Sequence, residues 1–126
     1  RLSDPMTATD TLLDAEAIAA LSVGALEDVK GEDIRVFDTQ ALSPLFDRVI
    51  VASAQSTRQT KALAQRVIQR AKEAGIPIVG VEGEALGEWV LVDLGPVVVH
   101  VMQPAVRAYY RLEDLWQHGA VGLPTA

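Results

Sequence analysis

The chain has 126 residues, which is enough for one domain with a buried core and too few for two comfortable ones. Hydrophobic residues make up 49% and charged residues 22%, the balance of a soluble globular protein, and no apolar run approaches the length of a membrane-spanning helix. Cysteine is absent, so disulfide bonds, thiolate catalysis and cysteine-ligated zinc are excluded. Because no basic segment followed by an apolar one opens the chain, we expect a cytoplasmic protein.

The net charge of −6 argues against broad nucleic-acid binding, which depends on neutralising phosphates, and no sequence-specific binding is expected. Acidic residues dominate before Arg48, whereas residues 48–74 contain six basic residues and Glu73 as the one acid. A solvated helix face is the favoured interpretation of the basic segment, and a contact surface is the alternative. The acidic remainder suits a basic partner.

The first periodic segment predicts a helix over residues 11–29, with Asp10 or Thr11 as its cap. Gly24 weakens the middle of this helix, since glycine costs about 1 kcal/mol relative to alanine. Lys30 and Gly31 are expected to end it.

The middle of the chain predicts two strands, a helix and a third strand. Residues 34–38 alternate between polar and apolar, and the β-branched run at residues 48–54 is typical of a buried strand. A capping-box pattern from Ser56 to Gln59 opens a helix that runs through Ala74, and residues 78–81 are again strand-like. The spacing is that of a βαβ crossover, which predicts that the strands before and after this helix form a parallel pair.

Residues 88–94 and 97–102 predict two strands joined by a tight turn at Gly95 and Pro96. A last helix is expected from Pro104 to about Trp116. The whole order predicts a single α/β domain with a mixed sheet of about five strands flanked by helices. We expect a disordered or expression-derived N-terminus at residues 1–10, the domain at 11–117 and a flexible tail at 118–126.

Several short motifs follow one another along the chain from about Ala17 to Trp116. They are Asp28–Val29–Lys30–Gly31–x–Asp33–Ile34, Asp47, Ser56–Thr57–Arg58–Gln59, Val81–Glu82–Gly83, Glu88–Trp89–Val90–Leu91–Val92–Asp93–Leu94–Gly95, Val97–Val98–Val99–His100–Val101–Met102 and Arg107–x–Tyr109–Tyr110–x–Leu112–Glu113–x–Leu115–Trp116. Each piece alone is unspecific, but the ordered set resembles the ribosomal silencing factor (Iojap-like) family. The chain departs from that pattern at Ala54, where the family usually has glycine, and at Pro96, where it usually has aspartate.

The resemblance implies a nucleotidyltransferase-like topology without the catalytic motif. It also implies a translational repressor that docks on the L-fourteen protein of the large ribosomal subunit and sterically blocks the small subunit when nutrients are short. Relatives form dimers, so a homodimer is a further expectation. No catalytic residue, metal or cofactor is expected.

Seven residues are the predicted partner-binding set: Trp89, Asp93, His100, Met102, Arg107, Tyr110 and Glu113. Tryptophan, tyrosine and arginine dominate binding hot spots, so Trp89 is the favoured anchor, with core packing as its alternative. For Trp116, core or hinge packing is the favoured interpretation.

The remaining members of the set carry open alternatives. Asp93 and His100 contact each other or lie on opposite faces, depending on the register of their strands, and the lone histidine is most simply a structural hydrogen-bonding residue. Arg107, Tyr110 and Glu113 fall at i, i+3 and i+6 on one side of a helix. They form either an internal ion pair with a packed ring or a polar rim beside the anchor.

The rival hypotheses are a metal-dependent nucleotidyltransferase-like enzyme and a generic dimeric adaptor. The enzyme would need carboxylates such as Asp38, Asp47, Glu82 and Asp93 to converge on a divalent cation. However, the chain has no Asp–x–Asp, no P-loop, no nucleophile elbow and no His–Glu–x–x–His. The repressor is therefore the preferred hypothesis.

Overall fold

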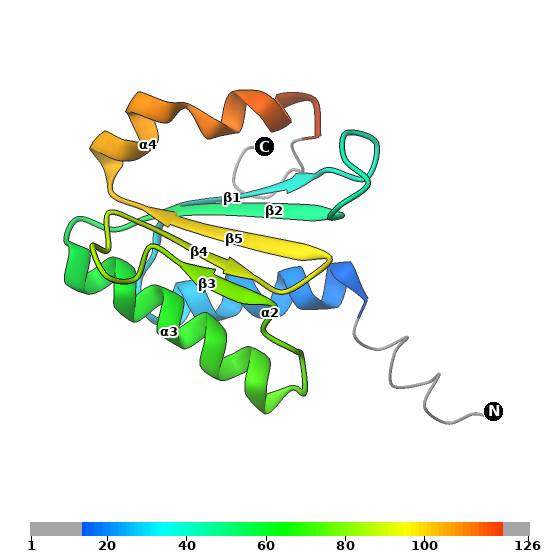
Figure 1. Cartoon of the computed structure of the whole chain (residues 1–126), viewed down its shortest axis with the longest axis horizontal. Coiled ribbons are helices and arrows are strands. Elements are labelled where there is room, and N and C mark those ends of the chain that lie inside the picture. The colour runs from blue at the N-terminus through cyan, green and yellow to red at the C-terminus, as the bar shows by residue number, and fades with distance from the viewer. Residues whose placement is uncertain (1–13, 120–126) are drawn as a thin grey trace.

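The computed structural model describes residues 14–119, and its elements follow the predicted order (Figure 1). They are α2 (Ala15–Asp28), β1 (Glu32–Asp38), β2 (Arg48–Ser53), α3 (Thr57–Glu73), β3 (Gly80–Glu82), β4 (Trp89–Asp93), β5 (Val97–Met102), α4 (Pro104–Tyr110) and the 3-10 helix η1 (Leu112–Gly119). The predicted α/β class, with a mixed five-stranded sheet flanked by helices, is confirmed. The N-terminal segment predicted at 1–10 and most of the predicted tail lie outside the described residues, and the domain limits stay predictions.

The sheet has the strand order β1-β2-β5-β4-β3, so β2 and β5 lie side by side at its centre. These two strands run parallel, and every other neighbouring pair in the sheet is antiparallel. Apart from Arg48 at the start of β2, every residue of both central strands is buried. Both strands are nearly continuous apolar runs, as expected for strands that are covered on both faces.

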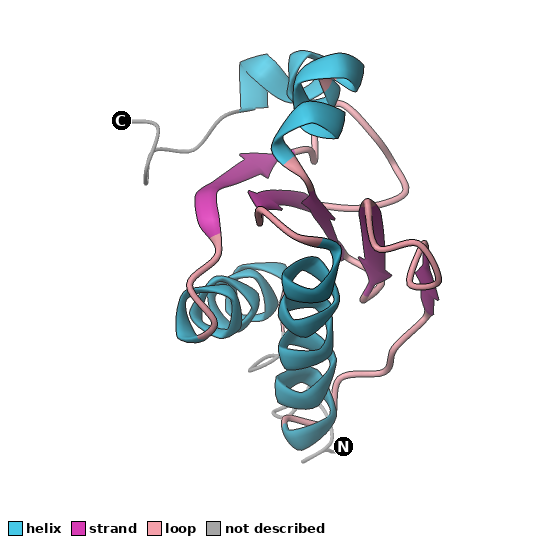
Figure 2. Ribbon diagram, turned by 90° about the vertical axis from the view of Figure 1, so that its left-hand side faces the viewer, coloured by secondary structure: helices cyan, strands magenta, loops and turns pink. Residues whose placement is uncertain are grey.

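Helices cover both faces of the sheet (Figure 1, Figure 2). α2 and α3 lie on one face, where the main core includes Ile50, Val90 and Val99. α4 and η1 lie on the other face, over a smaller cluster that includes Phe37 and Val49. Successive strand residues point to opposite faces, which is why Val49 and Ile50 belong to different clusters. No helix within residues 14–119 is long and apolar enough to cross a membrane.

The start of α2 differs from the prediction, while its end agrees. Asp14 is the N-cap, and its carboxylate accepts a hydrogen bond from the N–H of Ala17 at 2.9 Å. The predicted caps, Asp10 and Thr11, lie outside the described residues. The helix ends ahead of Lys30, which adopts a left-handed φ of 63°.

Helix α3 has the predicted cap and joins α2 through ion pairs. The hydroxyl of Ser56 accepts from the N–H of Gln59 at 3.1 Å. The guanidinium groups of Arg66 and Arg70 both pair with the carboxylate of Asp28, at 3.1 Å for Arg66. Because these side chains are more than one-third exposed, the pairs contribute little stability. They partly neutralise the basic segment, which favours its interpretation as a solvated face.

The predicted parallel pairing of the strands before and after α3 is wrong. β2 pairs with β1 and β5, whereas β3 lies at the edge of the sheet and pairs with β4. β3 runs in the same direction as β2, but β5 and β4 lie between them. The physical reason is burial: β5 offers six buried residues to the sheet centre, and the three residues of β3 are exposed or half-buried.

The helix predicted from Pro104 to about Trp116 is in fact two pieces. Arg111 adopts a left-handed conformation with φ 49°, which ends α4 at Tyr110, and η1 then begins at Leu112. The N–H of Arg111 still donates to the carbonyl of Arg107 at 3.0 Å. The break redirects the chain so that η1 contacts β1.

A pair of glycine substitutions tests this backbone. A Cβ added at Gly83, where φ is 87°, would lie 2.0 Å from the carbonyl oxygen of Trp89, whereas one at Gly24 in α2 would meet nothing within 4 Å. Gly83→Ala should therefore lower the free energy of unfolding by about 2 kcal/mol or more. Gly24→Ala should raise it by about 1 kcal/mol. Urea unfolding measures both, and shifts of the same sign would contradict the described backbone.

Candidate functional site

The β4–β5 hairpin resolves how Asp93 and His100 are related. Its register pairs Leu91 with His100 and Asp93 with Val98, so Asp93 and His100 lie on the same face of the sheet. The carboxylate of Asp93 accepts a hydrogen bond from the N–H of Gly95 at 2.8 Å. Asp93 thus stabilises the predicted turn of the hairpin.

Trp89 at the start of β4 is held by His100. The indole Nε1–H donates to Nδ1 of the imidazole at 3.0 Å, and the ring centroids lie 5.9 Å apart. Burial lowers the pKa of His100 from 6.5 to about 4, so the ring is neutral at physiological pH. Since Nδ1 is the acceptor, the proton of the neutral ring is assigned to Nε2.

Two tyrosines of α4 extend this contact to the surface. The ring of Tyr110 lies 5.0 Å from that of Trp89, and the ring of Tyr109 packs edge-on against Tyr110, also at 5.0 Å. Tyr110 is 57% exposed and Tyr109 79% exposed. His100, Trp89, Tyr110 and Tyr109 therefore form an aromatic row that runs from the buried sheet to solvent, with the amphipathic side chains that favour protein interfaces.

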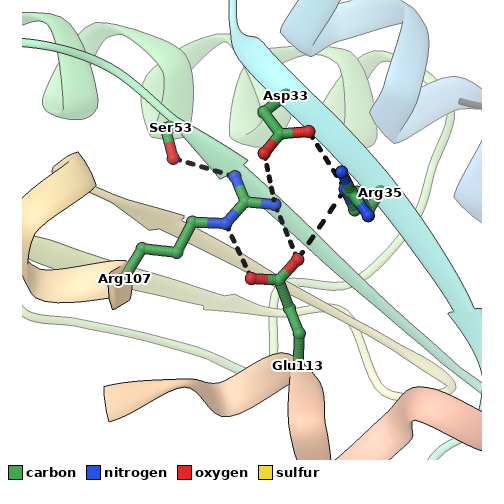
Figure 3. A network of polar contacts seen from close by, with 5 residues as sticks. All are labelled: Asp33, Arg35, Ser53, Arg107 and Glu113. Carbon is green, nitrogen blue, oxygen red and sulfur yellow. Dashed lines mark hydrogen bonds and ion pairs between the residues drawn. The ribbon is translucent and has the colours of Figure 1, made fainter. Parts of the chain in front are cut away.

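A cluster of charged residues lies between α4, η1 and the first two strands (Figure 3). The guanidinium of Arg107 donates two hydrogen bonds to the carboxylate of Glu113, both at 2.9 Å, and a third to the hydroxyl of Ser53 at 2.8 Å. Asp33 lies 3.5 Å from the same guanidinium and also binds Arg35 at 3.0 Å. The hydrogen bond and negative charge of Asp33 raise the pKa of Arg35, so this arginine stays cationic. We call these five residues the Arg107 cluster.

The structure places the seven predicted site residues in different environments. The rings of Trp89, His100 and Tyr110 pack against one another at a tilt, and Arg107 and Glu113 form an internal ion pair, which is one of the two alternatives left open for them.

Met102 is fully buried opposite Trp89, so it supports the indole from within the smaller core. Asp93 lies four residues along β4 from Trp89, about 13 Å away at the usual rise of a strand. The role of the seven residues in partner binding stays a prediction.

Sequence reasoning missed Tyr109, Ser53 and Asp33. Tyr109 and Asp33 both belong to the motifs quoted above. Tyr109 was not chosen because helical spacing selected only Arg107 and its neighbours at i+3 and i+6, and Asp33 lies outside that helix. Ser53 gives no local signal, because its role depends on an arginine 54 residues further along the chain.

Trp116 packs against other side chains, as predicted, and is not part of the aromatic row. Its ring meets that of Phe46 edge-on at 5.5 Å beside the smaller core cluster. The indole N–H is buried and finds no hydrogen-bond partner within residues 14–119.

The rival metal site finds no support in the described part of the chain. Among residues 14–119, no three histidine or carboxylate side chains are placed to hold one ion. Asp38 and Glu82 come from β1 and β3, which are the two opposite edges of the sheet. The carboxylates that the enzyme hypothesis requires therefore do not converge.

The buried imidazole predicts a pH-dependent stability. The pKa of His100 is about 4 in the folded chain and about 6.5 when unfolded, so the unfolded chain takes up more protons between these values. The stability that the neutral ring contributes is complete above about pH 6.5 and is lost as the pH falls toward 4. Between pH 7 and pH 4.5, urea unfolding should show the wild type losing about 2 kcal/mol more than His100→Asn, which keeps an acceptor for Trp89 but does not titrate. Equal losses in both proteins would contradict this assignment.

Comparisons with known proteins agree on one family. A family model described as "Ribosomal silencing factor during starvation" matches residues 13–124. The ribosomal silencing factor RsfS of Chromobacterium violaceum is 57% identical over 104 residues, which cover 82% of this chain and 85% of that protein.

A crystal structure of a Chromobacterium violaceum protein superposes with a TM-score of 0.83 and 52% identity, covering 90% of this chain and 95% of that one. A more distant relative, the mouse protein named "Mitochondrial assembly of ribosomal large subunit protein 1", is 31% identical over 97 residues, covering 75% of this chain and 42% of that protein. The order of motifs, the fold and these matches lead to one conclusion: the chain belongs to the ribosomal silencing factor family.

Proposed function

We propose that this chain represses translation by binding the large ribosomal subunit through its L-fourteen protein and sterically excluding the small subunit. The aromatic row carries the proposal, because it combines exposed rings with a buried support. Family membership and the name of the mouse relative, which mentions the large subunit, favour the same partner. The action requires no chemistry, and we propose that the chain is not an enzyme.

The row has the properties of a docking anchor. Trp89 is half-buried and fixed by a hydrogen bond, whereas the ring of Tyr110 packs against it at a tilt and stays mostly exposed. Such rings bury large areas on binding and lose few rotamers, because each has only two rotatable side-chain bonds. The net charge of −6 suits a basic ribosomal protein, through electrostatic attraction that speeds encounter.

The size of the chain suits a steric mechanism. A folded chain of this length has a radius of gyration of about 14 Å, which makes it a body roughly 35 Å across. A body of this size, bound where the two subunits would otherwise touch, would keep them apart. With the docking site on the face that meets the small subunit, as proposed, occupancy alone would inhibit.

The experiment is sedimentation of the purified protein with isolated large subunits, with small subunits added before or after it. We expect the protein to pellet with large subunits, and joined ribosomes to decrease when the protein is added first. A protein that stays in the supernatant at micromolar concentration contradicts the proposal. A sedimentation-equilibrium run on the protein alone tests the homodimer that the family resemblance implies.

The anchor is tested by single substitutions with a matched control. Tyr110→Ala removes a mostly exposed ring and should weaken binding to the large subunit about 30-fold, while Trp89→Ala should cost on the order of 2–4 kcal/mol. Lys61→Ala is the control, because Lys61 lies on α3 at the opposite face of the sheet and should bind like the wild type.

Circular dichroism of each variant separates lost binding from lost folding. Wild-type affinity in a folded Tyr110→Ala protein would remove the row from the interface. A large loss in Lys61→Ala would move the interface to α3.

A further inference from the structure

Apolar contacts alone hold helix α4, which carries Tyr110, only weakly to the rest of the fold. It has seven residues, all described by the structure, and of these only Arg107 is buried. Isolated helices of this length are unstable in water, so tertiary contacts must hold α4 in place. Val106 adds a partly buried apolar contact to the smaller core cluster. The position of α4 therefore depends largely on a polar side chain.

Arg107 connects α4 to three other elements. Its two bonds to Glu113 reach η1, its bond to Ser53 reaches β2, and its ion pair with Asp33 reaches β1 (Figure 3). The side chain is only 8% exposed, so water competes little for these bonds. Paired bonds between a planar guanidinium and a carboxylate also fix orientation, which a single charge contact does not.

The pair of Arg107 and Glu113 closes the chain around Tyr110. Arg107 lies one helical turn before Tyr110, and the left-handed Arg111 then turns the chain so that Glu113 returns to the guanidinium. In the sequence, Tyr110 thus lies between the two residues that form this ion pair. The ring of Tyr110 contacts that of Trp89, which lies on β4, whereas Arg107 binds residues of β1 and β2.

We propose that Arg107, through its two hydrogen bonds to Glu113 (the fork), is a positioning residue that holds α4 so that the ring of Tyr110 packs against Trp89 in the binding-competent arrangement. This inference rests on the proposed function for its link to the ribosome. Arg107 and Glu113 then act through the position of Tyr110 and do not form a polar rim that touches the partner. Without the fork, the competent arrangement is populated only part of the time, and the apparent affinity falls by that fraction.

Contact and positioning leave different kinetic signatures. A residue that touches the partner in the complex mainly raises the dissociation rate constant when it is removed. A residue that pre-organises the free protein lowers the apparent association rate constant, because fewer molecules are competent at each encounter. The proposal therefore predicts that loss of the fork slows association and leaves dissociation unchanged.

The test compares Arg107→Gln with Arg111→Gln. Both remove one positive charge, at positions four residues apart, but the side chain of Arg111 is 72% exposed and pairs with Asp114 at the surface. In free Arg107→Gln, amide hydrogen exchange should accelerate about tenfold in α4, while β5, which exchanges through global unfolding, stays far more protected than α4. The nuclear Overhauser contacts between Trp89 and Tyr110 should weaken, whereas Arg111→Gln should match the wild type in both measurements.

Binding is then measured by interferometry, with immobilised protein and large subunits in solution. We expect Arg107→Gln to lower the association rate constant about fivefold or more, with dissociation within about twofold of the wild type. Glu113→Gln, which keeps the size of the side chain and removes its charge, should act in the same direction.

Each result decides a different point. Unchanged exchange in α4 of Arg107→Gln overturns the positioning role, whatever the ribosome data show. Faster dissociation with unchanged exchange assigns Arg107 to the interface and also overturns it. If the wild type fails to bind, the proposed function fails together with the link to binding, while the exchange and nuclear Overhauser data still support or refute the fixing of Tyr110.

Discussion

The parallel pairing of β2 with β5 decides where every other element lies. Both strands are buried on both faces, so each face of the sheet needs a covering layer. Parallel neighbours cannot be joined by a tight hairpin, and the connection between them runs through α3, β3 and β4. The chain then continues from the end of β5 into α4 on the face opposite α3 (Figure 2). The position of Tyr110 over the sheet is a consequence of this path.

The two faces of the sheet are closed by different kinds of contact. α2 and α3 are long and bury apolar side chains, so hydrophobic burial is enough to hold them. α4 and η1 are short and meet the sheet through a small apolar cluster together with the Arg107 cluster. A layer attached in this way covers its face incompletely, and tyrosine rings remain exposed at its border. The candidate site therefore lies where hydrophobic closure of the fold is least complete.

Features of the chain that depend on near neighbours were predictable, and those that depend on competition between distant segments were not. The cap at Ser56 and the turn at Gly95 follow from a few adjacent residues, and both are present. The pairing of β2 was mispredicted because residues 78–81 and 97–102 are both apolar, and only their relative burial in the sheet decides between them. The break at Arg111 was missed because arginine carries no preference for a left-handed conformation.

The same division between local and long-range features holds for the candidate site. The family resemblance pointed to the aromatic and charged residues as the candidate binding site, but sequence spacing placed Arg107 and Glu113 on one continuous helix. Their actual pairing requires the helix to end between them. The register of β4 and β5 follows from the turn, yet whether Asp93 reaches His100 depends on what else binds its carboxylate, and that is the N–H of the turn. Contacts that span the fold, such as the one from Ser53 to Arg107, have no signature in the local sequence.

The hydrogen bond between Trp89 and His100 gives the buried titratable residue of the sheet a structural role. The indole only donates, so its partner must offer a lone pair, and the neutral imidazole does so at Nδ1. A protonated ring would direct N–H against N–H and release the tryptophan. Because burial lowers the pKa of His100 to about 4, the acceptor persists throughout the physiological range. The anchor is thus ordered before any partner arrives, and little further side-chain entropy is lost on docking. For the steric action that we propose, this ordering would matter more than any reactive group, because the effect would depend only on the fraction of time for which the site is occupied.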